Sequence, residues 1–254
     1  MVISFIFCTF ARHYATTTLG MKNIAFIVNP TLGCKTKNRV GKLLRDLLDL
    51  QLYSPTVVSS DYVGHATQLA HQFALEGYYA VVAVGGDGTV NEVASGLVGS
   101  HTALGIIPNG NNNHLAHHLD ISTRMNRAIE MLNTSEVINV DYGLINENPF
   151  FVSCDCQQTH YTFGNTDGYA EQVHIANVGQ WSNDTYMGPK VSMQDGKLDV
   201  TIVHKDYTKT IPTKEVQLVD ATAVQVDGNT IDTMTDIRIT IVEDGLKVLV
   251  KKRF

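Results

Sequence analysis

Two patterns of apolar residues divide this chain near residue 139. Before that point, short runs of consecutive apolar residues alternate with segments whose apolar residues recur every three or four positions. The runs are typical of buried parallel strands, and the recurring positions are typical of helices that cover them. We therefore expect a parallel sheet with helices on both faces and ligands at the carboxyl ends of its strands. The expected strands are residues 24–28, 56–58, 80–84 and 104–107, and the clearest helices cover 40–48 and 125–132.

From Val137 onward, strand-like runs dominate and few helical stripes occur. Turn residues separate these runs, which predicts a second, mostly antiparallel β domain. The expected strands cover residues 137–145, 150–154, 172–178, 198–203, 223–226, 237–242 and 247–250.

Composition and charge narrow the classes of partner. The 254 residues carry a formal charge of −6, so the chain lacks the basic footprint of a nucleic-acid-binding protein. The same charge argues against strong electrostatic binding to membranes, although a local basic patch is allowed. No apolar run reaches the 18 residues of a transmembrane helix. Residues 1–20 contain a short apolar stretch without a basic start, and we expect them to lie outside the fold.

The most informative stretch is Gly85-Gly-Asp-Gly-Thr89, between an apolar strand and a helix. Its glycines leave backbone N–H groups accessible, and a helix N-terminus favours anions, so the loop is a good phosphate site. Thr89 is expected to cap the helix. A carboxylate beside phosphate needs a cation, so Asp87 indicates Mg²⁺ shared with a nucleotide. The alternative is an ordinary turn in which Asp87 only caps.

The longer segment Gly-Gly-Asp-Gly-Thr-Val-Asn-Glu, which ends at Glu92, resembles the nucleotide loop of the diacylglycerol kinase and sphingosine kinase catalytic-domain family, with the bacterial lipid kinases as the closest branch. NAD kinases share only the first five residues. The resemblance implies an α/β nucleotide domain, an antiparallel β-sandwich domain with a cleft between the two, and a last strand that returns to the first domain. The expected boundaries are 1–20 for an extension, 21–139 for the α/β domain, 140–246 for a shortened β-sandwich and 247–254 for the return strand.

The resemblance also implies roles for individual residues. Asp227, in Gln-Val-Asp-Gly-Asn, matches the family's general base, and Asp87 would act with it at the metal–nucleotide. Without the family, the Asp-Gly pair at Asp227 would be taken as a hairpin turn. The residues expected to bind ATP are Ser60, Gly85, Gly86, Asp87, Gly88, Thr89, Asn91 and Asn111.

A second Mg²⁺ site is implied by the segment that runs from Ser192 to Val200, which resembles the family's Asp-Gly-x-Leu-Asp. The expected ligands are the Asp195 carboxylate and the backbones of Ser192 and Lys197. Oxygen ligands from a tight turn suit a hard cation, but Asp-Gly is equally a hairpin signal.

The sequence departs from the family at four points. Asn111 replaces a Thr that contacts nucleotide, and it can still form a hydrogen bond. His114 replaces an Asp and Asn229 replaces a Glu, so two acidic groups are lost. The β domain also looks short, because the polar stretch after Phe151 leads almost directly to Gln172.

Three functions remain open. The first is an ATP-dependent lipid kinase that phosphorylates diacylglycerol or a similar lipid, in the cytoplasm or peripherally at a membrane that it contacts transiently. The second is a nucleotide-binding pseudokinase, because of His114, Asn229 and the short β domain. The third, an NAD kinase, fits the motif less well. A homodimer is compatible with the sequence. We expect Asp87→Ala to abolish ATP turnover and to leave the fold intact, because a loop carboxylate contributes little packing.

Overall fold

The computed structural model describes residues 20–29, 34–182, 185–187, 191–231 and 236–252, so nearly all of the expected extension, 1–20, lies outside the described residues. The helices are α1 (Cys34–Leu47), α2 (His65–Leu75), α3 (Asp87–Leu97), α4 (His114–His118) and α5 (Met125–Leu132). The strands are β1 (Lys22–Val28), β2 (Tyr53–Ser59), β3 (Ala80–Gly85), β4 (Ala103–Pro108), β5 (Ser135–Ile145), β6 (Asn148–Phe150), β7 (Ser153–Phe163), β8 (Thr166–Ala176), β9 (Gln180–Ser182), β10 (Thr185–Met187), β11 (Leu198–Val203), β12 (Thr208–Thr213), β13 (Glu215–Val219), β14 (Ala223–Val226), β15 (Asn229–Ile231) and β16 (Asp236–Lys251).

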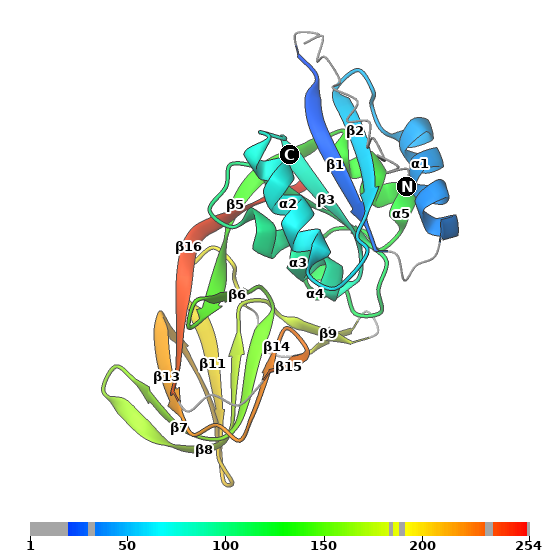
Figure 1. Ribbon diagram of the computed structural model, residues 1–254. Helices are drawn as coiled ribbons and strands as arrows, with labels where there is room; N and C mark the ends of the chain where they lie inside the picture. The colour runs from blue at the N-terminus through cyan, green and yellow to red at the C-terminus, as the bar shows by residue number, and fades with distance from the viewer. Residues whose placement is uncertain (1–19, 30–33, 183–184, 188–190, 232–235, 253–254) are drawn as a thin grey trace, which may run out of the picture.

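The first half is a parallel sheet in the order β2-β1-β3-β4. All residues of β3 and β4 are buried, as their unbroken apolar sequences predict for strands covered on both faces. Helices α2 and α3 pack together over one face, and α1 and α5 lie on the other (Figure 1). This arrangement confirms the predicted fold class for the first half.

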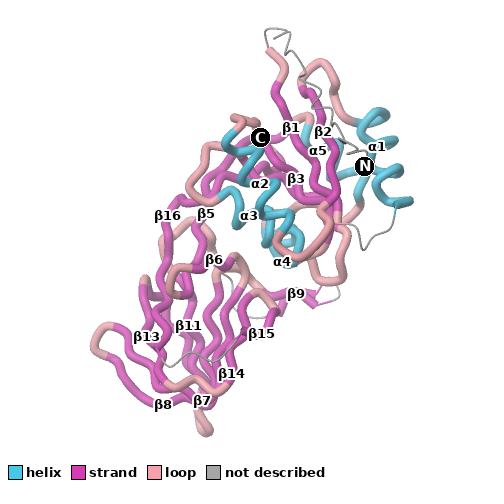
Figure 2. The backbone as a smooth tube through the Cα atoms, in the orientation of Figure 1, coloured by secondary structure: helices cyan, strands magenta, loops and turns pink. Residues whose placement is uncertain are grey.

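The second half is antiparallel, and two long strands connect it to the first (Figure 2). Strand β16 pairs with β5 along most of its length, and it also lies parallel to β4 at Val248 and Leu104. The described strands therefore form one continuous 14-stranded sheet and a separate two-stranded one. Two hydrophobic cores lie along the large sheet, one around the parallel strands and one between the antiparallel strands.

The expected domain boundaries stay a prediction, because the large sheet runs through both halves. The segment expected as a separate return strand, 247–254, begins inside the single strand β16. The pairing of β16 with β5 shifts between Val242 and Leu246, which explains why the sequence suggested two strands there.

Two local expectations were wrong. The polar stretch between Phe151 and Gln172 is a long hairpin of β7 and β8, in which inward residues such as Cys154 and Cys156 alternate with polar outward ones. Thr89 does not cap α3, because the helix begins at Asp87 with Gly86 in the N-cap position. Gly86 adopts an extended backbone there, so the helix starts three residues earlier than it would with Thr89 as its cap.

No helix in the described part of the chain is long and apolar enough to cross a membrane.

Candidate nucleotide and acceptor site

The glycine loop lies where the order of the parallel sheet changes direction. Strand β1 has β2 on one side and β3 on the other, so the connections that leave β1 and β3 lead to opposite faces of the sheet. Such a switch point leaves a crevice at the carboxyl ends of the strands. A cavity of about 460 Å³ occupies this place. Its lining comes from the ends of β1, β2, β3 and β4 and includes Asn29, Ser60, Gly86, Gly88, Thr89, Glu92 and Asn109.

Packing requires glycine at some positions of this region and not at others. A Cβ on Gly110 would lie 2.5 Å from the Cα of Gly86, so the loops after β3 and β4 can touch only as glycines. A Cβ on Gly88, in contrast, would meet no atom within 4 Å, and its backbone has no positive φ. Packing therefore does not require glycine at position 88, although an approaching ligand would.

The first turn of α3 presents donors to this cavity. Within any α-helix the first N–H groups have no intrahelical acceptor, and here they include those of Asp87 and Gly88. The Asn29 amide donates to Thr89 Oγ1 at 2.8 Å and so ties the end of β1 to the helix. Ser60 is buried at the end of β2 and lines the same cavity, whereas Asn111 is exposed in the turn after β4. The loop, Ser60 and Thr89 are therefore brought together.

Asp87 makes a connection that the sequence did not indicate. Its Oδ1 accepts the backbone N–H of His114 at 2.7 Å, and its Oδ2 accepts that of Asn113 at 2.9 Å. Asp87 therefore caps the N-terminus of α4, where a negative charge is favourable. His114, which stands where the family has an acid, contributes its backbone N–H to this contact, and any residue type except proline could do the same.

Asp227 lies between the two halves of the molecule. Its Oδ1 accepts N–H groups from Val152 at 2.7 Å and Ser153 at 3.0 Å, and its Oδ2 accepts one from Phe151 at 2.9 Å. The side-chain amide of Asn91, on α3, also donates to Oδ2. Burial raises the pKa of Asp227 to about 6, while these four donors act in the opposite direction.

The predicted contact of Asn91 with nucleotide stays a prediction. Its side chain points to the candidate base instead, one helical turn beyond the glycine loop. Asn229, which replaces a family Glu, is exposed at the start of β15.

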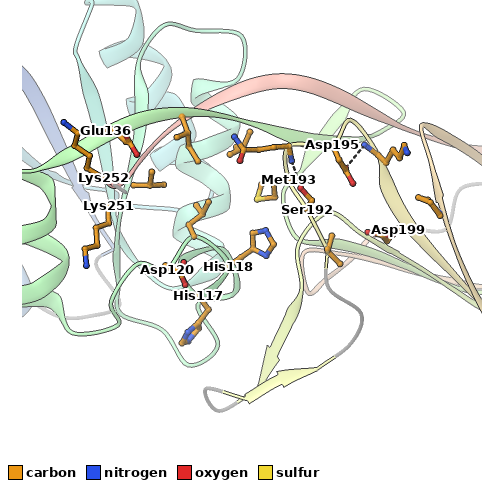
Figure 3. A pocket seen from close by; sticks show the side chains of 18 residues that line it. His117, His118, Asp120, Glu136, Ser192, Met193, Asp195, Asp199, Lys251 and Lys252 are labelled. Carbon is orange, nitrogen blue, oxygen red and sulfur yellow. Dashed lines mark hydrogen bonds between the residues drawn. The ribbon is translucent and has the colours of Figure 1, made fainter. Parts of the chain in front are cut away.

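The residues expected for the second Mg²⁺ site lie in the wall of a larger cavity of about 1180 Å³. Figure 3 shows Ser192 and Asp195 on one wall and His117 and His118, from α4, on another. One oxygen of Asp195 accepts the N–H of Lys197 at 3.1 Å, as in an ordinary turn. The described residues contain no group of three His, Cys, Asp or Glu side chains that could hold a metal ion, so this site stays a prediction.

Two acidic residues were missed by the sequence reasoning. Asp141, only 2% exposed, accepts the N–H groups of Gly196 and Asp244, each at 2.8 Å, and so fixes the Asp-Gly turn against β16. Glu92 accepts the N–H of Ala66 at 3.2 Å and holds the start of α2 beside the cavity. Glu92 was visible as the last residue of the motif, whereas nothing in the sequence around Asp141 marked it.

The match to a family profile decides what this architecture is related to. Residues 23–145 match the diacylglycerol kinase catalytic domain. The matched segment belongs to the diacylglycerol kinase catalytic-domain family. It contains the glycine loop, Ser60, Asn91 and α4, whereas Asp227 lies outside it.

Individual relatives resemble the same part of the chain. Over 133 residues it is 36% identical to a Streptococcus pneumoniae serotype 4 protein whose name gives it as an inferred lipid kinase, with coverage of 51% of this chain and 45% of the relative. Over 131 residues it is 30% identical to a diacylglycerol kinase of Staphylococcus saprophyticus, with coverage of 51% and 43%. The matched part therefore spans less than half of each of these relatives.

The whole fold has a close structural counterpart. A crystal structure named as a diacylglycerol kinase, from Bacillus anthracis str. Sterne, has a TM-score of 0.74 and 18% sequence identity, and the match covers 90% of this chain and 97% of that one. At this identity the likeness concerns the fold, and it confirms the predicted combination of a parallel and an antiparallel part.

Proposed function

We propose that this chain is an ATP-dependent lipid kinase that transfers the γ-phosphate to a lipid hydroxyl such as that of diacylglycerol. The observation that carries the proposal is the family match of residues 23–145, which contain the glycine loop and its cavity at the switch point of the sheet. The absence of a packing reason for Gly88 supports a ligand that comes close to the backbone there.

In this proposal the loop residues, Ser60 and Thr89 hold the nucleotide phosphates. Asp227 accepts the proton of the lipid hydroxyl as its oxygen attacks the γ-phosphate. A carboxylate with a pKa near 6 is ionised at neutral pH and is a better proton acceptor than an ordinary one.

Mg²⁺ accompanies the nucleotide in the proposal, where it would neutralise phosphate charge. Both oxygens of Asp87 already accept backbone N–H groups, although each carboxylate oxygen can accept more than one bond. The proposed proton transfer itself uses Asp227, a residue of this chain. Transient contact with a membrane surface from the cytoplasm follows from the lipid substrate, and a homodimer is compatible with the proposal.

The test is transfer of labelled phosphate from ATP to diacylglycerol in mixed micelles with Mg²⁺, next to a panel of other lipids. Gly88→Ala is the variant that tests the loop, because the added methyl group meets no protein atom and yet enters the proposed phosphate position. We expect the wild type to transfer phosphate, and Gly88→Ala to transfer it at least tenfold more slowly. Absence of transfer to every lipid would refute the proposal.

A nucleotide-binding pseudokinase is the second candidate, favoured by His114 and Asn229 in place of two acids. If it is correct, ATP binds without transfer, and the double variant His114→Asp with Asn229→Glu raises activity. An NAD kinase would phosphorylate NAD when NAD replaces the lipid as acceptor, and we expect no such product.

A further inference from the structure

The carboxylate of Asp227 has no acceptor position left for a substrate. A carboxylate offers about four positions, two on each oxygen, and all four are used here. Val152 and Ser153 donate to Oδ1, and Phe151 and Asn91 donate to Oδ2. A hydroxyl can therefore reach this carboxylate only by replacing one of these donors.

Three of the four donors are backbone groups that the fold holds in place. The N–H of Asp227 donates to Ser153 O at 2.9 Å, and Val226 pairs with Cys154 in the adjoining ladder of β14 and β7. Phe151 and Val152 lie between β6 and β7, and their carbonyl oxygens accept hydrogen bonds from Asn177, at 3.1 Å and 2.9 Å, so these donors are held by their neighbours as well. The backbone of the turn is also constrained, because Asp227 has a left-handed φ of 48°.

The fourth donor, Asn91, is a side chain that can rotate. Its amide oxygen is held by a long contact, a bond from Ser95 Oγ at 3.4 Å one turn further along α3. The exchangeable position is therefore on Oδ2 of Asp227. Asn91, which occupies this position, lies three residues after Gly88 on α3, which corresponds to about 4–5 Å along the helix axis.

We propose that Asn91 is a positioning residue for the acceptor: its amide donates to the position on Asp227 Oδ2 that the acceptor hydroxyl takes over when substrate binds. This inference rests on the proposed function for the transfer step. In that step the hydroxyl proton moves to Asp227 Oδ2, and the hydroxyl oxygen bonds to the γ-phosphorus. The bond from that phosphorus to the β-phosphate oxygen breaks, and ADP leaves with the electron pair.

Asn91→Ala has two expected consequences. The acceptor no longer competes with an internal amide, so its KM falls by about threefold to tenfold, the range of one hydrogen bond. Asp227 also loses a donor that favours its ionised form, so the acid limb of the activity profile moves to higher pH. The KM for ATP stays within twofold.

The experiment measures kcat and KM for a short-chain diacylglycerol and for ATP between pH 5 and 9, in the wild type, Asn91→Ala and Ser95→Ala. Ser95 touches Asn91 and not Asp227, so its variant controls for changes in the helix. An unchanged acid limb together with an unchanged acceptor KM in Asn91→Ala would overturn the inference. A higher KM for ATP with an unchanged acceptor KM would overturn it too, and would place Asn91 at the nucleotide.

A binding measurement separates this inference from the proposed function. Calorimetry with the same short-chain diacylglycerol needs no transfer, and we expect Asn91→Ala to bind it at least threefold more tightly than the wild type does. Tighter binding without phosphate transfer in the wild type would refute the kinase proposal and keep the acceptor position. Equal binding, or no binding by either protein, would refute the role of Asn91.

Discussion

Replacing Asp87 with alanine removes the acceptor of two backbone N–H groups at the start of α4. The sequence suggested that this change would leave the fold intact, whereas the structure predicts a loss of stability. Each bond from a backbone N–H to a charged acceptor contributes about 1.5–3 kcal/mol. Water can reach the half-buried loop and recover part of this, so we expect the free energy of unfolding to fall by about 2–4 kcal/mol.

Thermal unfolding measures this loss. For a chain of this size, about 1 kcal/mol corresponds to 2–4 °C in Tm, so Asp87→Ala is expected to unfold at least about 4 °C below the wild type. Hydrogen exchange should locate the change, with the amides of Asn113 and His114 exchanging at least tenfold faster. These two amides are the direct donors to Asp87.

Asp61→Ala is the matched control. It also removes one acidic residue beside the cavity, but the Asp61 carboxylate is exposed and pairs with His65 at 3.7 Å on the surface. Such a surface pair contributes at most about 1 kcal/mol. If Asp87→Ala unfolds within 2 °C of Asp61→Ala, the connection between Asp87 and α4 does not stabilise the protein, and the reasoning fails.

Three further predictions concern other parts of the molecule. Gly88→Ala should keep or slightly raise the Tm, since alanine is favoured over glycine in a helix by about 0.5–1 kcal/mol, and it should weaken ATP binding at least tenfold by calorimetry. Gly110→Ala should instead lower the Tm, because its Cβ would meet Gly86. A lower Tm for Gly88→Ala than for Gly110→Ala would contradict the loop geometry. Asp141→Asn should lower the unfolding free energy by about 2–4 kcal/mol in urea titrations, because one of two backbone N–H groups then faces an amide NH₂; a loss below 1 kcal/mol would be inconsistent with its buried contacts. The pKa of Asp227 is about 6 in the folded chain and about 4 in the unfolded chain, so the folded state binds more protons between pH 4 and 6. The contribution of Asp227 to stability therefore falls as the pH rises from about 4 to 6. Asp227→Ala should flatten that part of the profile of Tm against pH, and an unchanged slope would argue against the raised pKa.

The sequence by itself determined the fold class and the position of the glycine loop. Unbroken apolar runs such as Ala80–Val84 specify buried parallel strands, because a strand covered on both faces has no polar side. The glycine motif could be recognised because its residues are consecutive. Both signals depend on neighbours in the chain, and a sequence displays such neighbours directly.

The tertiary structure decided how the candidate site is connected. Asp87 binds α4, Asn91 binds Asp227, and Asp141 joins the Asp-Gly turn at Gly196 to β16. Each of these contacts spans at least 26 positions in the chain. The partners in all but one of these bonds are backbone N–H groups, which every residue except proline carries, so no residue type marks them in a sequence. Only the meeting of distant strand ends shows that the acidic residues of this site are already held by the fold.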